Sequence, residues 1–128
     1  MNLQTQSSFP ISSLDDILQN MQKWLIETLG DSAEFMIPEL AEMFLEDAPP
    51  LISKIHDGLN LNDEIQVREA AHTLKGSSAS MGLQVISSHC KKIEAFAKSK
   101  ELPEATKIFP QLAAEYAQIK IVLEQLVE

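Results

Sequence analysis

The sequence predicts an all-α protein, an antiparallel up-down four-helix bundle with an additional N-terminal helix packed on it. Three observations predict this fold class. Apolar residues recur every three to four positions along almost the whole chain of 128 residues. Stretches that alternate polar and apolar side chains, as half-buried strands do, are nearly absent. Hydrophobic residues make up 45% of the chain, which is enough to bury a core.

The first predicted helix runs from about residue 13 to residue 29. Ser12 or Ser13 can cap its start, because a serine hydroxyl accepts a hydrogen bond from an unpaired N–H of the first turn. Gly30 suits the position after its end. The residues that form a stripe at spacings of three and four are Leu14, Ile17, Leu18, Met21, Trp24, Leu25 and Thr28.

The second predicted segment begins after Asp31 or Ser32, and one apolar face continues to Leu59. Pro49 and Pro50 interrupt it. Each proline removes a backbone donor and crowds the preceding turn. We therefore expect either a kink or two abutting helices in this segment.

The third and fourth predicted helices form a hairpin. Asn62 or Asp63 caps the third helix, which ends near residues 81–82. The fourth helix follows almost at once, over residues 83–98. So short a link forces the two helices to lie antiparallel.

The last predicted helix has Pro103 in its first turn, where a missing N–H costs nothing. Pro110 should bend this helix or mark its effective start. Residues 1–11 are expected to form a flexible tail, which leaves residues 12–128 as one bundle domain.

The third predicted helix carries a histidine on the side away from its core face. On a wheel of ~100° per residue, the core-facing residues fall within roughly 60° of Leu74, whereas His72 falls at roughly 160° from Leu74. The imidazole of His72 should therefore point into solvent. The core face consists of Val67, Ala70, Ala71, Leu74, Ser78 and Met81.

The neighbours of His72 indicate a surface that another molecule approaches. Gly76 lies one turn later on the same face and Ala79 lies one turn beyond, so the surface beside the ring is bare. A glycine inside a helix costs about 0.5–1 kcal/mol relative to alanine, so a function should offset that cost. Lys75 and Arg68 place cations on either side of the imidazole. This arrangement suits a nitrogen that carries a dianionic group.

The chemistry of imidazole fits that interpretation. A free histidine is largely neutral near pH 7, so a ring nitrogen can attack a phosphoryl donor without a base. The transfer passes through a loose transition state, and Lys75 would offset the charge on its equatorial oxygens. The sequence contains no phosphate-binding loop for a nucleotide. The chain could therefore hold a phosphoryl group but lacks the parts to take one from ATP.

The fourth predicted helix places a carboxylate beside its own apolar stripe, which consists of Leu83, Ile86, Cys90, Ile93 and Ala97. Glu94 falls roughly 40° from the centre of this stripe and therefore needs a hydrogen-bond partner. In an antiparallel hairpin it could accept a ring N–H of His72 and fix the tautomer. It could instead accept the hydroxyl of Ser77 or Ser78. On the same flank, Lys91 and Lys98 would extend a basic rim around the site.

Residues 71–94, AHTLKGSSASMGLQVISSHCKKIE, closely resemble the signature of histidine-containing phosphotransfer (HPt) domains. The family pattern is H-x-L-K-G-S-S, then a glycine, and then a cysteine and a Leu/Ile–Glu/Gln pair on the next helix. The sequence supplies every one of these positions: His72, Leu74, Lys75, Gly76, Ser77, Ser78, Gly82, Cys90, Ile93 and Glu94.

The resemblance implies a role for each site residue. His72 would be the phosphorylated residue, Lys75 would assist the phosphoryl group, Gly76 would keep the surface open and Glu94 would orient the imidazole. The partners would be receiver domains of response regulators and hybrid histidine kinases, with transfer from aspartate to His72 to aspartate. We expect Mg²⁺ and much of the catalysis to come from the partner, so the chain itself would not be an enzyme.

Composition excludes several other classes. The formal net charge of −9 disfavours nucleic acid and anionic lipid, because both are polyanions. One cysteine and three scattered histidines give no metal-ligand spacing. The N-terminal residues have neither the basic nor the apolar region of a secretory signal, so a cytoplasmic location is expected. We expect no cofactor and no metal in the chain, and both His56 and His89 are interpreted as surface residues.

Two alternatives remain at this point. The chain could be a non-catalytic helical adaptor, in which case His72 takes no label. It could also supply the phosphoacceptor helices of a histidine kinase, which would be an obligate dimer. That class usually has an acidic residue directly after its histidine, whereas Thr73 follows His72 here. A phosphocarrier is instead expected to be a monomer.

Overall fold

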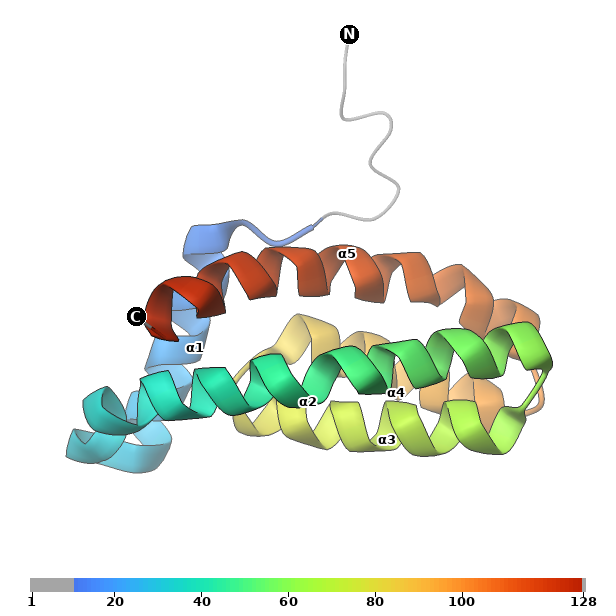
Figure 1. Ribbon diagram of the computed structural model, residues 1–128, viewed down its shortest axis with the longest axis horizontal. Coiled ribbons are helices and arrows are strands. Elements are labelled where there is room, and N and C mark those ends of the chain that lie inside the picture. The colour runs from blue at the N-terminus through green and yellow to red at the C-terminus, as the bar shows by residue number, and fades with distance from the viewer. Residues whose placement is uncertain (1–10, 128) are drawn as a thin grey trace, which may run out of the picture.

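The computed structural model describes residues 11–127, and in this part of the chain five α-helices account for nearly every residue (Figure 1). The expected tail, residues 1–11, lies outside the described residues except for Ile11. In chain order the elements are α1 (Leu14–Leu29), the short 3-10 turn η2 (Gly30–Ser32), α2 (Ala33–Leu61), α3 (Glu64–Ser80), α4 (Gln84–Lys98) and α5 (Leu102–Val127).

Helices α2 to α5 form an antiparallel bundle in which each helix packs against the next, and α5 closes the ring against α2. Helix α1 crosses one end of this bundle and packs on α5 and on the start of α2 (Figure 1). The all-α fold class with an extra N-terminal helix is therefore confirmed. Within residues 11–127, no helix combines the length and the apolar character that a membrane span requires.

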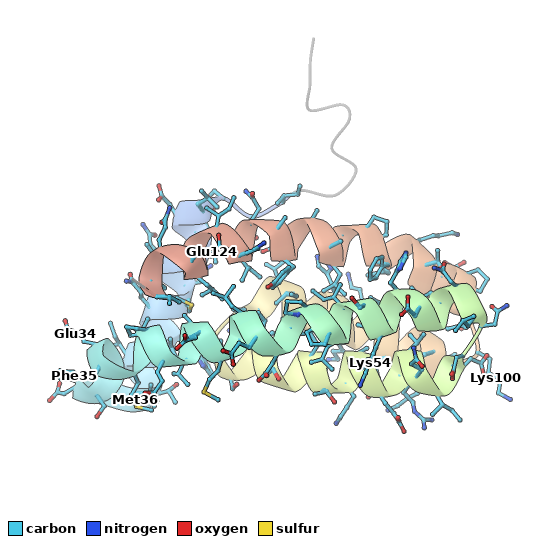
Figure 2. All side chains as sticks on the ribbon, in the orientation of Figure 1. Glu34, Phe35, Met36, Lys54, Lys100 and Glu124 are labelled. Carbon is cyan, nitrogen blue, oxygen red and sulfur yellow. The ribbon has the colours of Figure 1, made fainter. Side chains whose placement is uncertain are left out.

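The start of α2 extends past the end of α3, toward the end of the molecule that α1 crosses (Figure 1). There Phe35 and Met36 project outward rather than into the bundle, and Phe35 is 83% exposed (Figure 2). The first turns of α2 therefore contribute an outer surface, and the bundle core begins further along the helix.

Helix α2 is one unbroken helix of 29 residues, although Pro38, Pro49 and Pro50 all lie inside it. The expectation of two abutting helices is therefore wrong. Ala48 and Ile55, on either side of the proline pair, are both 0% exposed. Their burial holds the segment helical despite the lost backbone bonds, because tertiary packing contributes more to helix stability than local propensity does.

Helix α5 likewise continues through Pro110 from its start at Leu102. Pro110 is therefore not the effective start of the helix. The first turn contains Pro103, as predicted.

Side-chain caps fix where α1 and α3 begin. The Ser13 hydroxyl accepts a hydrogen bond from the Asp16 N–H at 3.1 Å, and the Asp63 carboxylate accepts one from the Gln66 N–H at 3.0 Å. Asn62 instead ends α2 in the left-handed conformation, with φ 56°. Both predicted helix starts are confirmed, and the link between α2 and α3 is only two residues long.

The turn from α3 to α4 is tied down from two sides. The Leu83 N–H donates to the Ser78 carbonyl at 2.9 Å, and Gly82 adopts a φ of +75° that an L side chain rarely takes. Trp24 of α1 covers this turn and donates from its indole N–H to the Ser80 carbonyl at 3.4 Å. The hairpin therefore has a fixed register.

The predicted core faces of α3 and α4 are confirmed, because every residue assigned to them is buried. This burial fixes the rotation of both helices about their axes. It therefore decides which residues of the hairpin face outward and which face the groove between α3 and α4.

Candidate functional site

His72 points away from the core, as predicted. Its side chain is 67% exposed, whereas its neighbours Ala71 and Leu74 are each 0% exposed. One turn further along α3, Gly76 is exposed, and a Cβ atom built there would meet nothing within 4 Å. The surface beside the imidazole is therefore open to an approaching molecule.

Glu94 of the neighbouring helix α4 contacts the imidazole. Its Oε2 atom lies 2.9 Å from the Nδ1 atom of His72, and its side chain is only 8% exposed. The alternative in which Glu94 serves a serine hydroxyl is wrong: Ser77 donates to the Thr73 carbonyl at 3.1 Å, and Ser78 donates to the Leu74 carbonyl at 2.7 Å.

Two lysines also face the Glu94 carboxylate. The Nζ atom of Lys75 donates to Oε1 at 2.6 Å, and the Nζ atom of Lys98 lies 3.6 Å from Oε2. Lys75 comes from α3 and lies one turn after His72, whereas Lys98 comes from α4 and lies one turn after Glu94. The carboxylate therefore has an imidazole and two ammonium groups around it.

These contacts decide the charge of Glu94. Burial alone would raise the pKa of its carboxyl group, but the hydrogen bonds from Lys75 and His72 outweigh burial and lower the pKa below the ordinary 4.5. Glu94 is therefore ionised at neutral pH.

The ionised carboxylate also fixes the histidine tautomer. A carboxylate only accepts hydrogen bonds, so the Nδ1 atom of His72 must carry the proton that it donates to Glu94. In the neutral ring the lone pair is therefore on Nε2 and not on Nδ1. The site thus presents one nucleophilic nitrogen in a defined orientation.

A second bond between the helices supports the site. The Ser87 hydroxyl of α4 donates to the Lys75 carbonyl of α3 at 3.1 Å. This hydrogen bond fixes the position of α4 along α3, and therefore the position of Glu94 relative to His72 and Lys75. The spacing of Ser87 in the sequence gives no sign that its hydroxyl faces a carbonyl of the neighbouring helix.

A shallow hollow surrounds the imidazole. The other predicted basic residues are distributed unevenly around it: Arg68 and Lys98 line it, whereas Lys91 does not and is simply exposed on α4. Ala79 is exposed two turns beyond His72 on α3. The residues lining the hollow are Arg68, Glu69, His72, Thr73, Glu94 and Lys98.

The remaining histidines and the cysteine lie elsewhere. His56 is exposed as predicted, but His89 is half-buried and its Nδ1 atom has no hydrogen-bond partner among residues 11–127. Burial lowers the pKa of His89, although Glu115 opposes this shift. Cys90 is buried, and burial raises the pKa of its thiol to about 12, so it is an unreactive core residue. Within the described residues no three metal-ligating side chains gather.

The fold and this geometry together define a helical bundle that presents one oriented, exposed histidine. Comparison with known proteins gives the class a name. The Hpt domain family matches residues 39–122, which include α3, α4 and most of α2 and α5, and the chain belongs to this family.

Particular relatives agree. The chain is 26% identical over 125 residues to Histidine-containing phosphotransfer protein 2 of Arabidopsis thaliana. The aligned residues cover 95% of this chain and 78% of the relative. It is 30% identical over 90 residues to Sensor protein TorS of Escherichia coli (strain K12), covering 67% of this chain but 10% of that protein.

A solved structure is also similar. The crystal structure of histidine-containing phosphotransfer protein B (HptB) from Pseudomonas aeruginosa PAO1 superposes with a TM-score of 0.70 and 28% sequence identity, over 82% of this chain and 88% of that one. The family and these relatives support a phosphorelay role for the chain.

Proposed function

We propose that this chain is a phosphorelay intermediate, which accepts a phosphoryl group from a receiver aspartate on the Nε2 atom of His72 and passes it to another receiver aspartate. One observation carries the proposal. The imidazole of His72 is 67% exposed, while its Nδ1 atom is hydrogen-bonded to the buried, ionised Glu94. A ring held in this way offers Nε2 alone to a phosphoryl donor.

The chemistry follows from the arrangement. The lone pair of Nε2 attacks phosphorus in line with the departing aspartate oxygen, through a loose transition state whose charge is spread over three oxygens. Lys75, whose side chain is 31% exposed, can turn from Glu94 toward those oxygens. Arg68 lies on the other side of the hollow, and Gly76 and Ala79 leave room for the donor to approach.

The rest of the machinery belongs to the partner. We infer that the receiver domain supplies both the aspartate and the Mg²⁺ that neutralises the transferring group, so the chain is a carrier and not an enzyme. Receiver domains of response regulators and hybrid histidine kinases are the partners proposed. The similarity to a segment of a sensor protein supports the second of these.

The bundle also favours a carrier over the phosphoacceptor helices of a kinase. Four helices of this single chain close around one core, so the site needs no second copy to complete it. We propose a cytoplasmic monomer that uses the surface of His72, Gly76, Arg68, Lys91 and Lys98 for docking.

The test is transfer of radiolabel from a phosphorylated receiver domain in the presence of Mg²⁺, with His72→Gln in parallel. We expect acid-labile, base-stable label on the wild type and none on the variant. Because His72 is exposed, the variant should keep its fold, which circular dichroism checks. Label on both proteins would identify another residue as the acceptor, and label on neither would leave a structural adaptor.

A further inference from the structure

The Glu94 carboxylate divides its two oxygens unequally. Lys75 holds Oε1 alone at 2.6 Å, whereas His72 and Lys98 share Oε2 at 2.9 and 3.6 Å. The contact to Lys75 is a short charge-assisted hydrogen bond, but the contact to Lys98 is longer than a hydrogen bond. Lys98 is therefore close to Glu94 without being fully engaged.

This division matters once Lys75 turns to a phosphoryl group. Nε2 lies across the ring from Nδ1, so the phosphoryl oxygens and Glu94 draw the Lys75 ammonium in different directions. The Glu94 side chain is only 8% exposed and cannot rely on water to replace a lost cation. A buried carboxylate that loses its partner is strongly destabilised.

We propose that Lys98 is a positioning residue that takes the place of Lys75 on Glu94 while His72 is phosphorylated. This inference rests on the function proposed above. The geometry allows the exchange: Lys98 lies four residues after Glu94 on α4, in the order favoured for a helical ion pair, and its side chain is 60% exposed and able to move.

Other charged groups around the ring do not replace Lys98 in this role. Arg68 and Glu69 line the same hollow from α3, but neither makes an ion pair or a side-chain hydrogen bond to Glu94 in the described part of the chain. Among residues 11–127, Lys75 and Lys98 are the two lysines within 4 Å of the carboxylate.

The transfer step balances with Glu94 held in place. The Nε2 lone pair forms the N–P bond, and the electrons of the breaking P–O bond leave on the aspartate oxygen. The ring becomes a cation. Its Nδ1 atom keeps its proton and still donates it in the hydrogen bond to Glu94, so the ring neither gains nor loses a proton. The return step breaks the N–P bond and restores the neutral ring. Lys98 keeps the carboxylate anchored through both steps.

The test measures the ratio of phosphohistidine to phosphoaspartate at equilibrium, with a labelled receiver domain and Mg²⁺. We expect Lys98→Gln to lower this ratio about three- to fivefold, the size of one partly exposed ion pair. Lys98→Arg should restore it. Lys92→Gln is the matched control, because it removes an exposed lysine from the same helix, outside the hollow, and should leave the ratio unchanged.

A double-mutant cycle separates this role from direct contact with the phosphoryl group. If Lys98 acts through Glu94, then Lys98→Gln should change nothing further in a Glu94→Gln background. An equal loss in both backgrounds would overturn the proposal and assign Lys98 to the phosphoryl oxygens. An unchanged ratio in Lys98→Gln would also overturn the proposal for Lys98. If the wild type is labelled in that experiment, the phosphorelay function is still supported. Absence of label on the wild type would instead overturn that function.

Discussion

Two regions of the molecule each contain one buried glutamate and one glycine, yet they use them differently. The His72 face consists of His72, Gly76, Glu94 and the lysines around Glu94. The α1 seam is the place where α1 and the residue before its cap meet α5 and the α3–α4 turn, and it contains Ser12, Trp24, Gly82 and Glu115. Glu94 is 6% exposed and Glu115 is 3% exposed, so burial alone does not tell them apart.

Their partners do tell them apart. Glu94 faces His72, Lys75 and Lys98, all of which have exposed surface. Glu115 accepts a hydrogen bond from the Ser12 backbone N–H at 3.2 Å, which fastens the chain before α1 to α5. In this protein the two buried glutamates are therefore distinguished by their partners: those of Glu94 include an exposed imidazole, whereas that of Glu115 is a backbone N–H.

The glycines show the same contrast. A Cβ at Gly76 would meet nothing, whereas a Cβ at Gly82 would lie 2.5 Å from the Cβ of Trp24. Gly82 also has a positive φ, and Gly76 does not. The α1 seam needs its glycine for packing and backbone geometry, and the His72 face uses its glycine to remain open.

The largest difference between the two regions should appear when each glutamate is replaced by leucine. We expect Glu94→Leu to slow phosphotransfer about 10- to 100-fold, because the imidazole loses the acceptor that orients it. Glu115→Leu should leave the rate within about twofold and lower the free energy of unfolding by about 0.5–1.5 kcal/mol, since the Ser12 N–H loses its acceptor. Transfer rates and urea unfolding measure the two effects, and equal loss of transfer in both variants would contradict the distinction.

The glycines offer a smaller comparison, in stability alone. Gly76→Ala should raise the free energy of unfolding by about 0.5–1 kcal/mol, because alanine is the better helix former and meets no neighbour. Gly82→Ala should lower it by about 1–3 kcal/mol, through the clash with Trp24 and the strained φ. Thermal unfolding of the two variants gives the sign of each change. A destabilised Gly76→Ala would mean that the site glycine is needed for the fold.

The His72 face was largely predictable from the sequence, because its geometry follows from helical periodicity. The core residues of α3 and α4 fix the rotation of both helices, and that rotation turns His72 outward and Glu94 toward the groove. A hairpin link of three residues then places the two helices side by side.

Other features depend on distances that periodicity does not contain. The wheel placed Lys98 on the correct flank, but the oxygen of Glu94 that it faces follows only from the packed hairpin. The bond from Ser87 to the Lys75 carbonyl is of the same kind. The continuation of α2 through Pro49 and Pro50 without a break does not follow from the sequence, because local propensity counts the lost hydrogen bonds but not the burial of Ala48 and Ile55. The partial burial of His89 does not follow from the sequence, because spacing along one helix does not show how α4 packs against its neighbours.

The smallest expected effect is a pH dependence of stability at the His72 face. Burial raises the pKa of Glu94, but its hydrogen bonds lower that pKa by more than burial raises it. The pKa in the folded protein therefore lies below the ordinary 4.5. A carboxyl group with a lowered folded pKa contributes stability that is complete above its unfolded pKa and is lost as the pH falls through its folded pKa. We therefore expect Glu94→Gln to lose less stability than the wild type between about pH 5 and pH 3, as measured by urea unfolding at each pH.

Glu104→Gln is the control, because it breaks an exposed pair with Lys107 at 3.1 Å that should contribute little at any pH. Parallel acid curves for wild type and Glu94→Gln would mean that the cations around Glu94 serve phosphotransfer without stabilising the fold.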